Sequence, residues 1–194
     1  MESLRFAVVC SSNQNRSMEA HHLLNKRGYN VKSYGIGSVV KLPGASANEP
    51  IIYPFGTTYE DMYQDLYQRD PHLYTQNGIL QMLDRNRRIK PSPERFQEAT
   101  EDKFNIIFTV GEKIFDTVID DIESRGPQIY SPVHVININI QDNLDEATFG
   151  SFLFCEMCEM MSDSEDLDNE IELILLEFEA KHTTRTVLHS ITFY

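Results

Sequence analysis

The chain has 194 residues, with 30 acidic against 17 basic side chains and a formal net charge of −13. This length suits one domain with a sizeable core, whereas the acidic balance argues against direct binding to RNA or DNA, which requires clustered basic charge. No stretch approaches the about 18 apolar residues that span a bilayer, the first residues lack a signal-peptide pattern, and three cysteines fit a reducing compartment.

The first predicted strand is an apolar run from Leu4 to Val9, which stops at Cys10. A helix is predicted from Met18 to Lys26, and small or polar residues fill the interval. The candidate phosphate-binding residues of this interval are Ser11, Ser12, Asn13, Gln14, Asn15 and Arg16. Successive backbone N–H groups in such a loop can surround an oxyanion, and the following helix directs its positive end to the same point.

Cys10 is the candidate nucleophile of this loop. A helix N-terminus and a nearby guanidinium favour the thiolate, which is the reactive form of cysteine. Arg16 offers a planar fork for two phosphate oxygens, and the Ser17 hydroxyl could donate to the thiolate when it leaves. The alternative is a buried cysteine at a strand end beside a surface arginine, and the spacing alone does not exclude it.

A second strand is predicted from Asn30 to Ile36, so that strand, helix and strand open an α/β fold with a parallel sheet. Residues 37–55 are rich in glycine and proline and are predicted to be an irregular surface segment, in which Lys41 to Gly44 form a turn. A helix follows to Asp70, with Thr57 as its N-cap, Glu60 in the capping-box position and five apolar or aromatic residues on its inner face. These five are Tyr59, Met62, Tyr63, Leu66 and Tyr67.

Pro71 should stop that helix, and a further helix is predicted from Thr75 to Asp84. The two helices could form a lid or a wall beside Cys10. The segment from Arg85 to Arg95 then contains five basic residues. A solvated loop is the ordinary interpretation, and the alternative is a source of positive potential for an anionic phosphopeptide.

The second half of the chain continues the α/β pattern. Strands are predicted at 104–110 and 132–140, with a helix from Glu112 to Glu123 between them. In an open parallel sheet, ligands bind beyond the carboxyl ends of the strands. Asp142, which follows the second of these strands, is therefore expected at the same edge as Cys10, although an Asp-Asn pair is also common in turns.

Three elements are predicted after Asp142. A helix over 147–161 carries Cys155 and Cys158 at the phase of Phe152, so the two thiols are expected to be buried packing residues. An acidic amphipathic helix covers 167–178, and an edge strand covers 186–193. Ten acidic and no basic residues lie from Glu156 to Glu179, which favours a protein partner over nucleic acid or, equally, a solvated surface. No pattern typical of a metal site is found.

The motif Val9-Cys10-x5-Arg16-Ser17 resembles that of the low-molecular-weight protein tyrosine phosphatases. Longer strings resemble one branch, the RNA polymerase II carboxy-terminal-domain phosphatases of the mRNA cleavage and polyadenylation machinery, from about Arg5 to Tyr194. These strings are CSSNQNRSMEAH, YTQNGILQMLDRN, RIKPSPERFQ, NIQDN and TFY.

The resemblance implies a three-layer α/β fold with a mostly parallel open sheet, low-molecular-weight tyrosine phosphatase-like topology, extra lid helices and a C-terminal edge strand. Residues 1–194 would form a single phosphatase domain with a helical insertion at about 57–99. The implied activity is removal of phosphate from the fifth-position serine of the polymerase repeat, with the following proline bond in cis. It implies a phosphocysteine intermediate on Cys10 and no metal or other cofactor.

The resemblance also assigns residues and partners. Asp142 would be the general acid, although Asn143 stands where the tyrosine phosphatases usually have proline, and Asn139 stands where relatives can have aspartate. The substrate groove would include Lys41, Leu42, Pro43, Tyr74 and Met82. Expected partners are the phosphorylated polymerase tail and a symplekin-like polyadenylation scaffold, without a nucleic acid or membrane partner. The expected compartment is the nucleus, with the cytoplasm as a second one.

Two other functions stay open on the sequence. A general low-molecular-weight tyrosine phosphatase would prefer phosphotyrosine over a phosphoserine–proline peptide. A scaffold component of the polyadenylation complex would retain its function after Cys10→Ser. An arsenate-reductase-like role would need resolving cysteines near Cys10, and Cys155 and Cys158 are expected on a distant helix.

Overall fold

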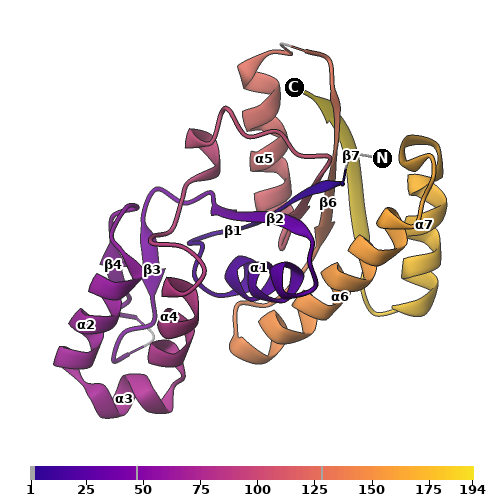
Figure 1. The fold of residues 1–194 in the computed structure, drawn as a ribbon. Coiled ribbons are helices and arrows are strands. Elements are labelled where there is room, and N and C mark those ends of the chain that lie inside the picture. Colours follow the sequence, from indigo (N-terminus) through magenta and orange to yellow (C-terminus); the bar gives the residue numbers. More distant parts are fainter. Residues whose placement is uncertain (1–2, 47, 128) are drawn as a thin grey trace.

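The computed structural model describes residues 3–46, 48–127 and 129–194, and its centre is a five-stranded sheet of order β2-β1-β5-β6-β7 (Figure 1). The strands are β1 (Arg5–Cys10), β2 (Asn30–Gly35), β5 (Ile106–Thr109), β6 (Pro132–Ile138) and β7 (Val187–Phe193). The first four are parallel, and β7 runs antiparallel to β6 at the edge. The predicted mostly parallel open sheet with a C-terminal edge strand is confirmed.

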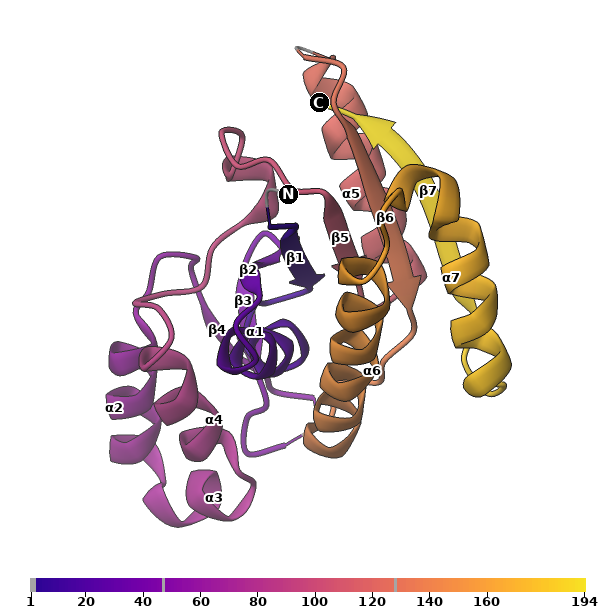
Figure 2. The same cartoon turned by 45° about the vertical axis from the view of Figure 1, so that its right-hand side comes forward.

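Helices cover both faces of this sheet, which makes three layers (Figures 1 and 2). One face carries α1 (Arg16–Lys26), α6 (Leu144–Ser162) and α7 (Leu167–Lys181), and the other carries α5 (Glu112–Arg125). The four residues from Phe6 to Val9 are at most 1 % exposed, because a central parallel strand is covered on both faces. The helices predicted at 112–123 and 167–178 are confirmed, each extending two or three residues further.

The segment 37–55 is not irregular, contrary to the prediction. It forms a two-stranded antiparallel sheet of β3 (Val40–Leu42) and β4 (Ile51–Tyr53). Val40, Leu42 and Tyr53 are buried, so the short strands bury one side of their sheet. Proline and glycine on both sides of three-residue strands concealed this alternation in the sequence.

The buried side of this small sheet packs on three helices, α2 (Tyr59–Arg69), α3 (Pro71–Gln76) and α4 (Ile79–Arg87), which lie beside the main sheet (Figure 1). The boundaries differ from those predicted, because Pro71 begins α3 and Gly78, at φ +80°, separates α3 from α4. The N-cap of α2 is Thr58, whose hydroxyl accepts from the Asp61 amide, rather than Thr57. Tyr67, expected inside, is half exposed.

The basic segment from Arg85 to Arg95 is not a solvated loop, because it begins inside α4 and its basic side chains form ion pairs. Its side chains are paired within the fold: Arg85 with Glu19, Arg87 with Glu60 and Asp84, Arg88 with Asp84, Lys90 with Glu94, and Arg95 with Glu98. Arg85 and Lys90 are only 16 % and 11 % exposed. Much of the positive potential expected here is therefore neutralised, and a short 3₁₀ helix (Phe96–Glu98) follows the segment.

Helix α6 begins three residues before the predicted start, with Asn143 as its N-cap. Cys155 and Cys158 are buried packing residues, as predicted, but Phe152, assigned to the same face, is 53 % exposed. Among the helices within the described residues, none combines the length and the apolar character needed to cross a bilayer.

Gly35 should be intolerant of a side chain, because β2 ends against the loop that follows Cys10. An added Cβ would lie 2.7 Å from the Ser11 carbonyl oxygen and 3.0 Å from the Asn13 amide nitrogen. We expect Gly35→Ala to lower the free energy of unfolding by on the order of 2–3 kcal/mol in urea denaturation. Gly111→Ala is the control, since its Cβ would meet only Ile114 at 3.8 Å and should cost under about 1 kcal/mol as a poorer N-cap. Equal losses of unfolding free energy in the two variants would show that the close contacts at Gly35 do not make it intolerant of a side chain.

Candidate active site

Cys10 ends β1 and is 3 % exposed. Its Sγ lies 3.0 Å from the Ser17 Oγ and accepts a hydrogen bond from the Asn13 amide at 3.2 Å. Helix α1 begins at Arg16, two residues earlier than predicted, so Arg16 and Ser17 belong to its first turn. An amide, a hydroxyl and a helix N-terminus thus surround the sulfur, and all three favour negative charge on it.

Asn13 holds the loop in shape. Its backbone is left-handed, with φ +53°, and its side chain is completely buried. The Nδ2 group donates to the Ser17 Oγ at 2.9 Å and to the Ser33 Oγ at 3.2 Å, while the Oδ1 accepts from the Glu94 amide at 3.0 Å. The Asn13 carbonyl accepts from the Tyr59 hydroxyl at 2.7 Å. The loop is therefore tied to α1, β2, α2 and the segment after α4.

Two other side chains of the loop also form hydrogen bonds with neighbouring elements. The Ser12 Oγ accepts from the Lys41 amide at 3.1 Å, and the Gln14 side chain is 3 % exposed and donates to the Met62 sulfur at 3.5 Å. The Gln14 carbonyl accepts from the side chains of Asn86 and Arg85. Since these groups hold the loop to its neighbours, phosphate binding would fall to backbone amides and to Arg16.

The Arg16 guanidinium lies along the carboxyl edge of the sheet and is 11 % exposed. It donates to the Ile140 carbonyl at 2.9 Å and, at 3.4 Å, to the Ser11 hydroxyl of the loop. The Nε is buried without a hydrogen bond and lies 3.5 Å from the Asp142 Oδ1. Arg16 is thus held between the thiol loop and the segment that carries the candidate acid.

Asp142 lies at the same edge of the sheet as Cys10, as predicted. The Asn15 side chain donates to its Oδ1 at 3.1 Å, and the carboxylate remains 62 % exposed. Its neighbour Asn143 accepts from the Glu146 amide and caps α6. The Asn139 side chain is hydrogen-bonded to the side chains of Asn137 and Glu112. The acid role of Asp142 stays a prediction.

Cys10 and Asp142 line one cavity of about 120 Å³. Its walls come from the thiol loop, β3 with the following turn, α4, and the start of α6. The other lining residues are Ser12, Gln14, Asn15, Lys41, Leu42, Pro43, Ile79, Met82, Asn143 and Leu144. Helix α4 therefore forms a wall beside Cys10, as the sequence suggested for the added helices.

Four of the five predicted substrate-groove residues lie on this cavity, namely Lys41, Leu42, Pro43 and Met82. Tyr74 does not: it is 3 % exposed and packs in the core of the β3–β4 and helical unit. The substrate-binding role of Tyr74 stays a prediction.

Sequence reasoning missed the residues that position the loop. Ser33 and Tyr59 bind Asn13 from 20 and 46 residues away, and Asn86 binds Gln14 from 72 residues away. Tyr59 was recognised only as a core residue, and Asn86 lay unnoticed within a basic segment. No local spacing marks such partners, because the contacts form only when distant elements pack.

Arg185, in the turn before β7, clamps the segment that carries Asp142. Its guanidinium donates to the Asn139 carbonyl at 3.0 Å and forms a two-point ion pair with Glu146, with both distances 3.0 Å. This pair holds the pKa of Glu146 below its usual value. Arg185 also lies over the Phe149 ring. The residues before and after Asp142 are thereby fixed relative to each other.

His21 extends the network behind the thiol loop, since its Nδ1 lies 2.8 Å from the Ser33 Oγ. Burial, with Lys90 and His22 adding to it, lowers the pKa of His21 to about 4. His21 is therefore neutral at pH 7.

Cys155 and Cys158 are poor candidates for a resolving thiol, because both lie in α6 and burial raises the pKa of each. In residues 3–46, 48–127 and 129–194, no group of three or more His, Cys, Asp or Glu side chains is placed to hold a metal ion. Metal independence stays a prediction.

Comparison with known proteins gives full-length matches. The family model described as Ssu72-like protein matches residues 4–194. The RNA polymerase II C-terminal domain phosphatase SSU72 of Homo sapiens is 56 % identical over 191 residues, which is 98 % of this chain and 97 % of the relative. The Xenopus laevis protein of the same name is 57 % identical over the same shares.

Solved structures agree with these matches. The Drosophila melanogaster serine phosphatase of the RNA polymerase II CTD superimposes with a TM-score of 0.95 at 52 % identity, over 99 % of this chain and all of that chain. D. melanogaster Ssu72 was also solved with Symplekin and a cis peptidomimetic of the CTD that is phosphorylated on the fifth-position serine. This structure gives a TM-score of 0.94 at 50 % identity, over 99 % of both chains.

The low pKa of His21 predicts a pH-dependent stability. Between its unfolded pKa of about 6.5 and its folded pKa of about 4, the unfolded chain binds more protons, so stability falls as the pH falls through this window. We expect His21→Gln to remove up to about 3 kcal/mol of this dependence in urea unfolding between pH 7 and pH 4. His72→Gln, at an exposed position of α3, should keep the wild-type slope. An unchanged slope in His21→Gln would refute the assignment.

Loss of the Arg185 ion pair with Glu146 should most affect substrates whose leaving group needs a proton. If the clamp positions the candidate acid, Arg185→Gln should lower turnover of a phosphoserine peptide about tenfold while leaving an activated aryl phosphate nearly unaffected. Arg125→Gln is the matched control, because Arg125 also joins a carboxylate, Asp121, to a backbone carbonyl but does so on α5. The two variants should lose similar stability, and only the first should change the ratio of the two rates. An equal change of this ratio in both variants would contradict a positioning role.

Proposed function

The chain belongs to the Ssu72-like protein family, and on that basis we propose that it is a phosphatase of the RNA polymerase II C-terminal domain. The proposed substrate is the phosphoserine–proline site at the fifth position of the repeat. The observation that carries the proposal is the convergence of the Cys10 sulfur and the Asp142 carboxylate on one cavity, at the N-terminus of α1. The same cavity thus offers a nucleophile and a proton donor, as cleavage of a serine phosphate requires.

In the first proposed step, the Cys10 thiolate attacks phosphorus while the bond from phosphorus to the serine oxygen breaks. Asp142, protonated at the start, transfers its proton to that oxygen, and the peptide leaves with a neutral hydroxyl. Arg16 and the loop amides hold the remaining phosphate oxygens as charge develops on them. The product is a phosphocysteine at Cys10 and an ionised Asp142.

In the second step, water attacks the phosphorus of the phosphocysteine. Asp142 takes a proton from this water, the sulfur–phosphorus bond breaks, and inorganic phosphate and the Cys10 thiolate are formed. The Ser17 hydroxyl, 3.0 Å from the sulfur, stabilises the departing thiolate. This cycle returns every group to its starting state with no metal ion.

The cavity walls support a peptide substrate with a proline after the phosphoserine. Leu42, Pro43, Ile79 and Met82 offer apolar surface beside the thiol, against which a compact proline turn can pack. The related Drosophila protein was solved with a cis peptidomimetic of the phosphorylated repeat, and we extend the cis preference to this chain. Lys41, on the same cavity, supplies positive charge near the phosphate.

The proposed cellular setting follows from the same relative, which was solved with Symplekin. We extend this to a symplekin-like partner, to mRNA processing and to a nuclear location, with the cytoplasm as a second one. Residues 1–194 would act as one phosphatase domain, in which residues 57–99 supply the added wall.

Replacement of the nucleophile should abolish activity without loss of fold. A serine hydroxyl at position 10 is not ionised at neutral pH, so Cys10→Ser should release no phosphate from a phosphoserine–proline peptide above background. Its circular dichroism spectrum and urea midpoint should match those of the wild type. Cys155→Ser is the control thiol and should remain active. Near-full turnover by Cys10→Ser, or loss of wild-type activity in EDTA that added metal restores, would exclude this mechanism.

The role of Asp142 as proton donor can be tested with two substrates whose leaving groups differ in basicity. A serine alkoxide needs a proton far more than para-nitrophenolate does, so Asp142→Asn should slow phosphate transfer from a phosphoserine–proline peptide by roughly 10²–10⁴. The loss with para-nitrophenyl phosphate should be much smaller. The measurement is single-turnover transfer to Cys10.

Asp145→Asn is the control for this experiment, because Asp145 is exposed in the first turn of α6 and should matter little with either substrate. Glu146 is unsuitable as a control, since it forms the clamp with Arg185. Equal losses on both substrates, or a larger loss at Asp145, would show that another group donates the proton.

A further inference from the structure

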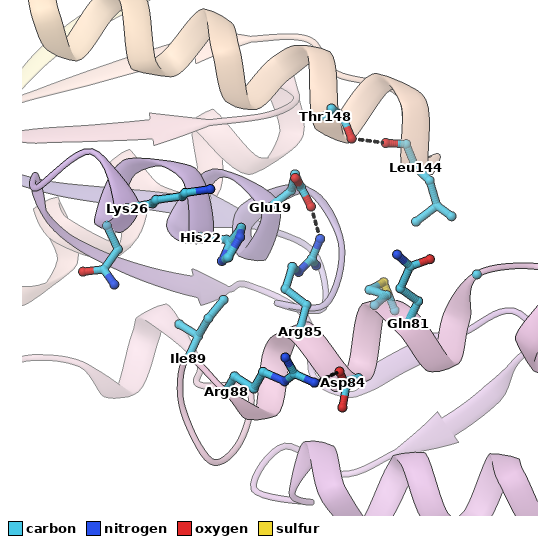
Figure 3. A pocket seen from close by; sticks show the side chains of 13 residues that line it. Glu19, His22, Lys26, Gln81, Asp84, Arg85, Arg88, Ile89, Leu144 and Thr148 are labelled. Carbon is cyan, nitrogen blue, oxygen red and sulfur yellow. Dashed lines mark hydrogen bonds and ion pairs between the residues drawn. The ribbon is translucent and has the colours of Figure 1, made fainter.

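A second cavity of about 730 Å³ continues from the cavity that holds Cys10. It lies between α1, α4 and the start of α6 (Figure 3). The two cavities share Met82 and Leu144. An extended chain that leaves the thiol past these two residues would enter this groove. The groove is therefore placed to contact the substrate beyond the phosphoserine.

An ion pair between Glu19 of α1 and Arg85 of α4 joins the two helices in the middle of the groove (Figure 3). The two side chains are only 22 % and 16 % exposed, so they form its floor rather than free binding groups. Arg85 also donates to the Gln14 carbonyl at 3.1 Å. The floor is thus fastened to the phosphate-binding loop, which fixes the groove relative to Cys10.

The walls of the groove carry cations that the fold does not fully neutralise. Lys26 of α1 has no ion-pair partner among residues 3–46, 48–127 and 129–194, and Arg88 of α4 shares Asp84 with Arg87 while remaining 75 % exposed. Both lie on the groove together with His22. Three basic residues against two acidic ones line the groove of a chain whose formal charge is −13, and this local excess of positive charge favours an anionic ligand.

The length of α1 between Ser17 and Lys26 suggests the spacing of that ligand. Ser17 contacts the Cys10 sulfur, and Lys26 lies nine residues later on the same helix, or about 13 Å along its axis. An extended peptide advances about 3.3–3.6 Å per residue, so this length corresponds to about four residues. A phosphorylated repeat peptide can place a second phosphate at that separation.

We propose that this groove binds the substrate chain next to the phosphoserine, and that Lys26 and Arg88 recognise a second phosphate about four residues from the one that is hydrolysed. The proposal rests on the proposed function and names a further determinant of its specificity. Neither cation lies on the cavity that holds Cys10, so their contribution falls on substrate binding and leaves the chemical step unchanged.

The test compares steady-state kinetics on three peptides that carry one phosphoserine–proline site. One has no other charge, and two carry a non-hydrolysable phosphonate four residues before or four residues after the phosphoserine. For the wild type, one of the two phosphonate peptides should have a KM roughly threefold to tenfold below that of the plain peptide, with similar kcat, as expected of partly exposed ion pairs.

Lys26→Gln and Arg88→Gln should each reduce this preference while leaving kinetics on the plain peptide unchanged. Lys113→Gln is the matched control, because Lys113 is an exposed cation of α5 on the other face of the sheet. The proposal is overturned if the wild type shows no preference in either arm, or if Lys113→Gln removes it as strongly as the groove variants. Failure of the proposed function would differ, since the wild type would then leave the plain peptide intact.

Discussion

The site depends on the hydrogen bonds of one buried amide side chain. Asn13 adopts a left-handed backbone conformation, which asparagine tolerates better than most residues. In this conformation its backbone N–H donates to the Cys10 sulfur. Its side chain then binds Ser17 and Ser33 and the Glu94 amide in a fully buried position. Because an unpaired buried amide is unfavourable, these hydrogen bonds stabilise this arrangement of the loop, in which the Asn13 backbone N–H and the Ser17 hydroxyl lie beside the thiol.

Sheet topology brings the remaining groups to this loop. Strands β1 and β6 are parallel, with β5 between them, so their carboxyl ends and the residues that follow share one edge. Cys10 ends β1, and Asp142 lies four residues beyond β6. Arg16 donates to the Ile140 carbonyl and so joins the two loops directly. The clamp of Arg185 on the Asn139 carbonyl adds a constraint from the far end of the chain.

Local patterns predicted the parts of this account that depend on neighbours in sequence. The strand, loop and helix around Cys10 are contiguous, and the placement of Asp142 required only the parallel order of the strands. The prediction of an irregular segment at 37–55 was wrong, because strands of three residues give too little alternation of buried and exposed residues to outweigh the neighbouring glycines and prolines. The pairing of the basic segment could not be predicted locally, because Glu19 and Glu60, which neutralise parts of it, lie on other helices. The burial of Tyr74 could not be predicted either, because resemblance can indicate a position near a groove but not how deeply its side chain is buried.

The central claim is that phosphate passes through the Cys10 sulfur, and trapping this intermediate tests it most directly. Asp142→Asn should form the phosphocysteine from para-nitrophenyl phosphate and hydrolyse it slowly, because the variant lacks the base for the attacking water. Rapid quenching, proteolysis and mass spectrometry should find one added phosphoryl group on the peptide that contains Cys10, formed with the burst of nitrophenolate. A burst with no phosphorylated Cys10 peptide, or with the phosphoryl group on another residue, would contradict the account.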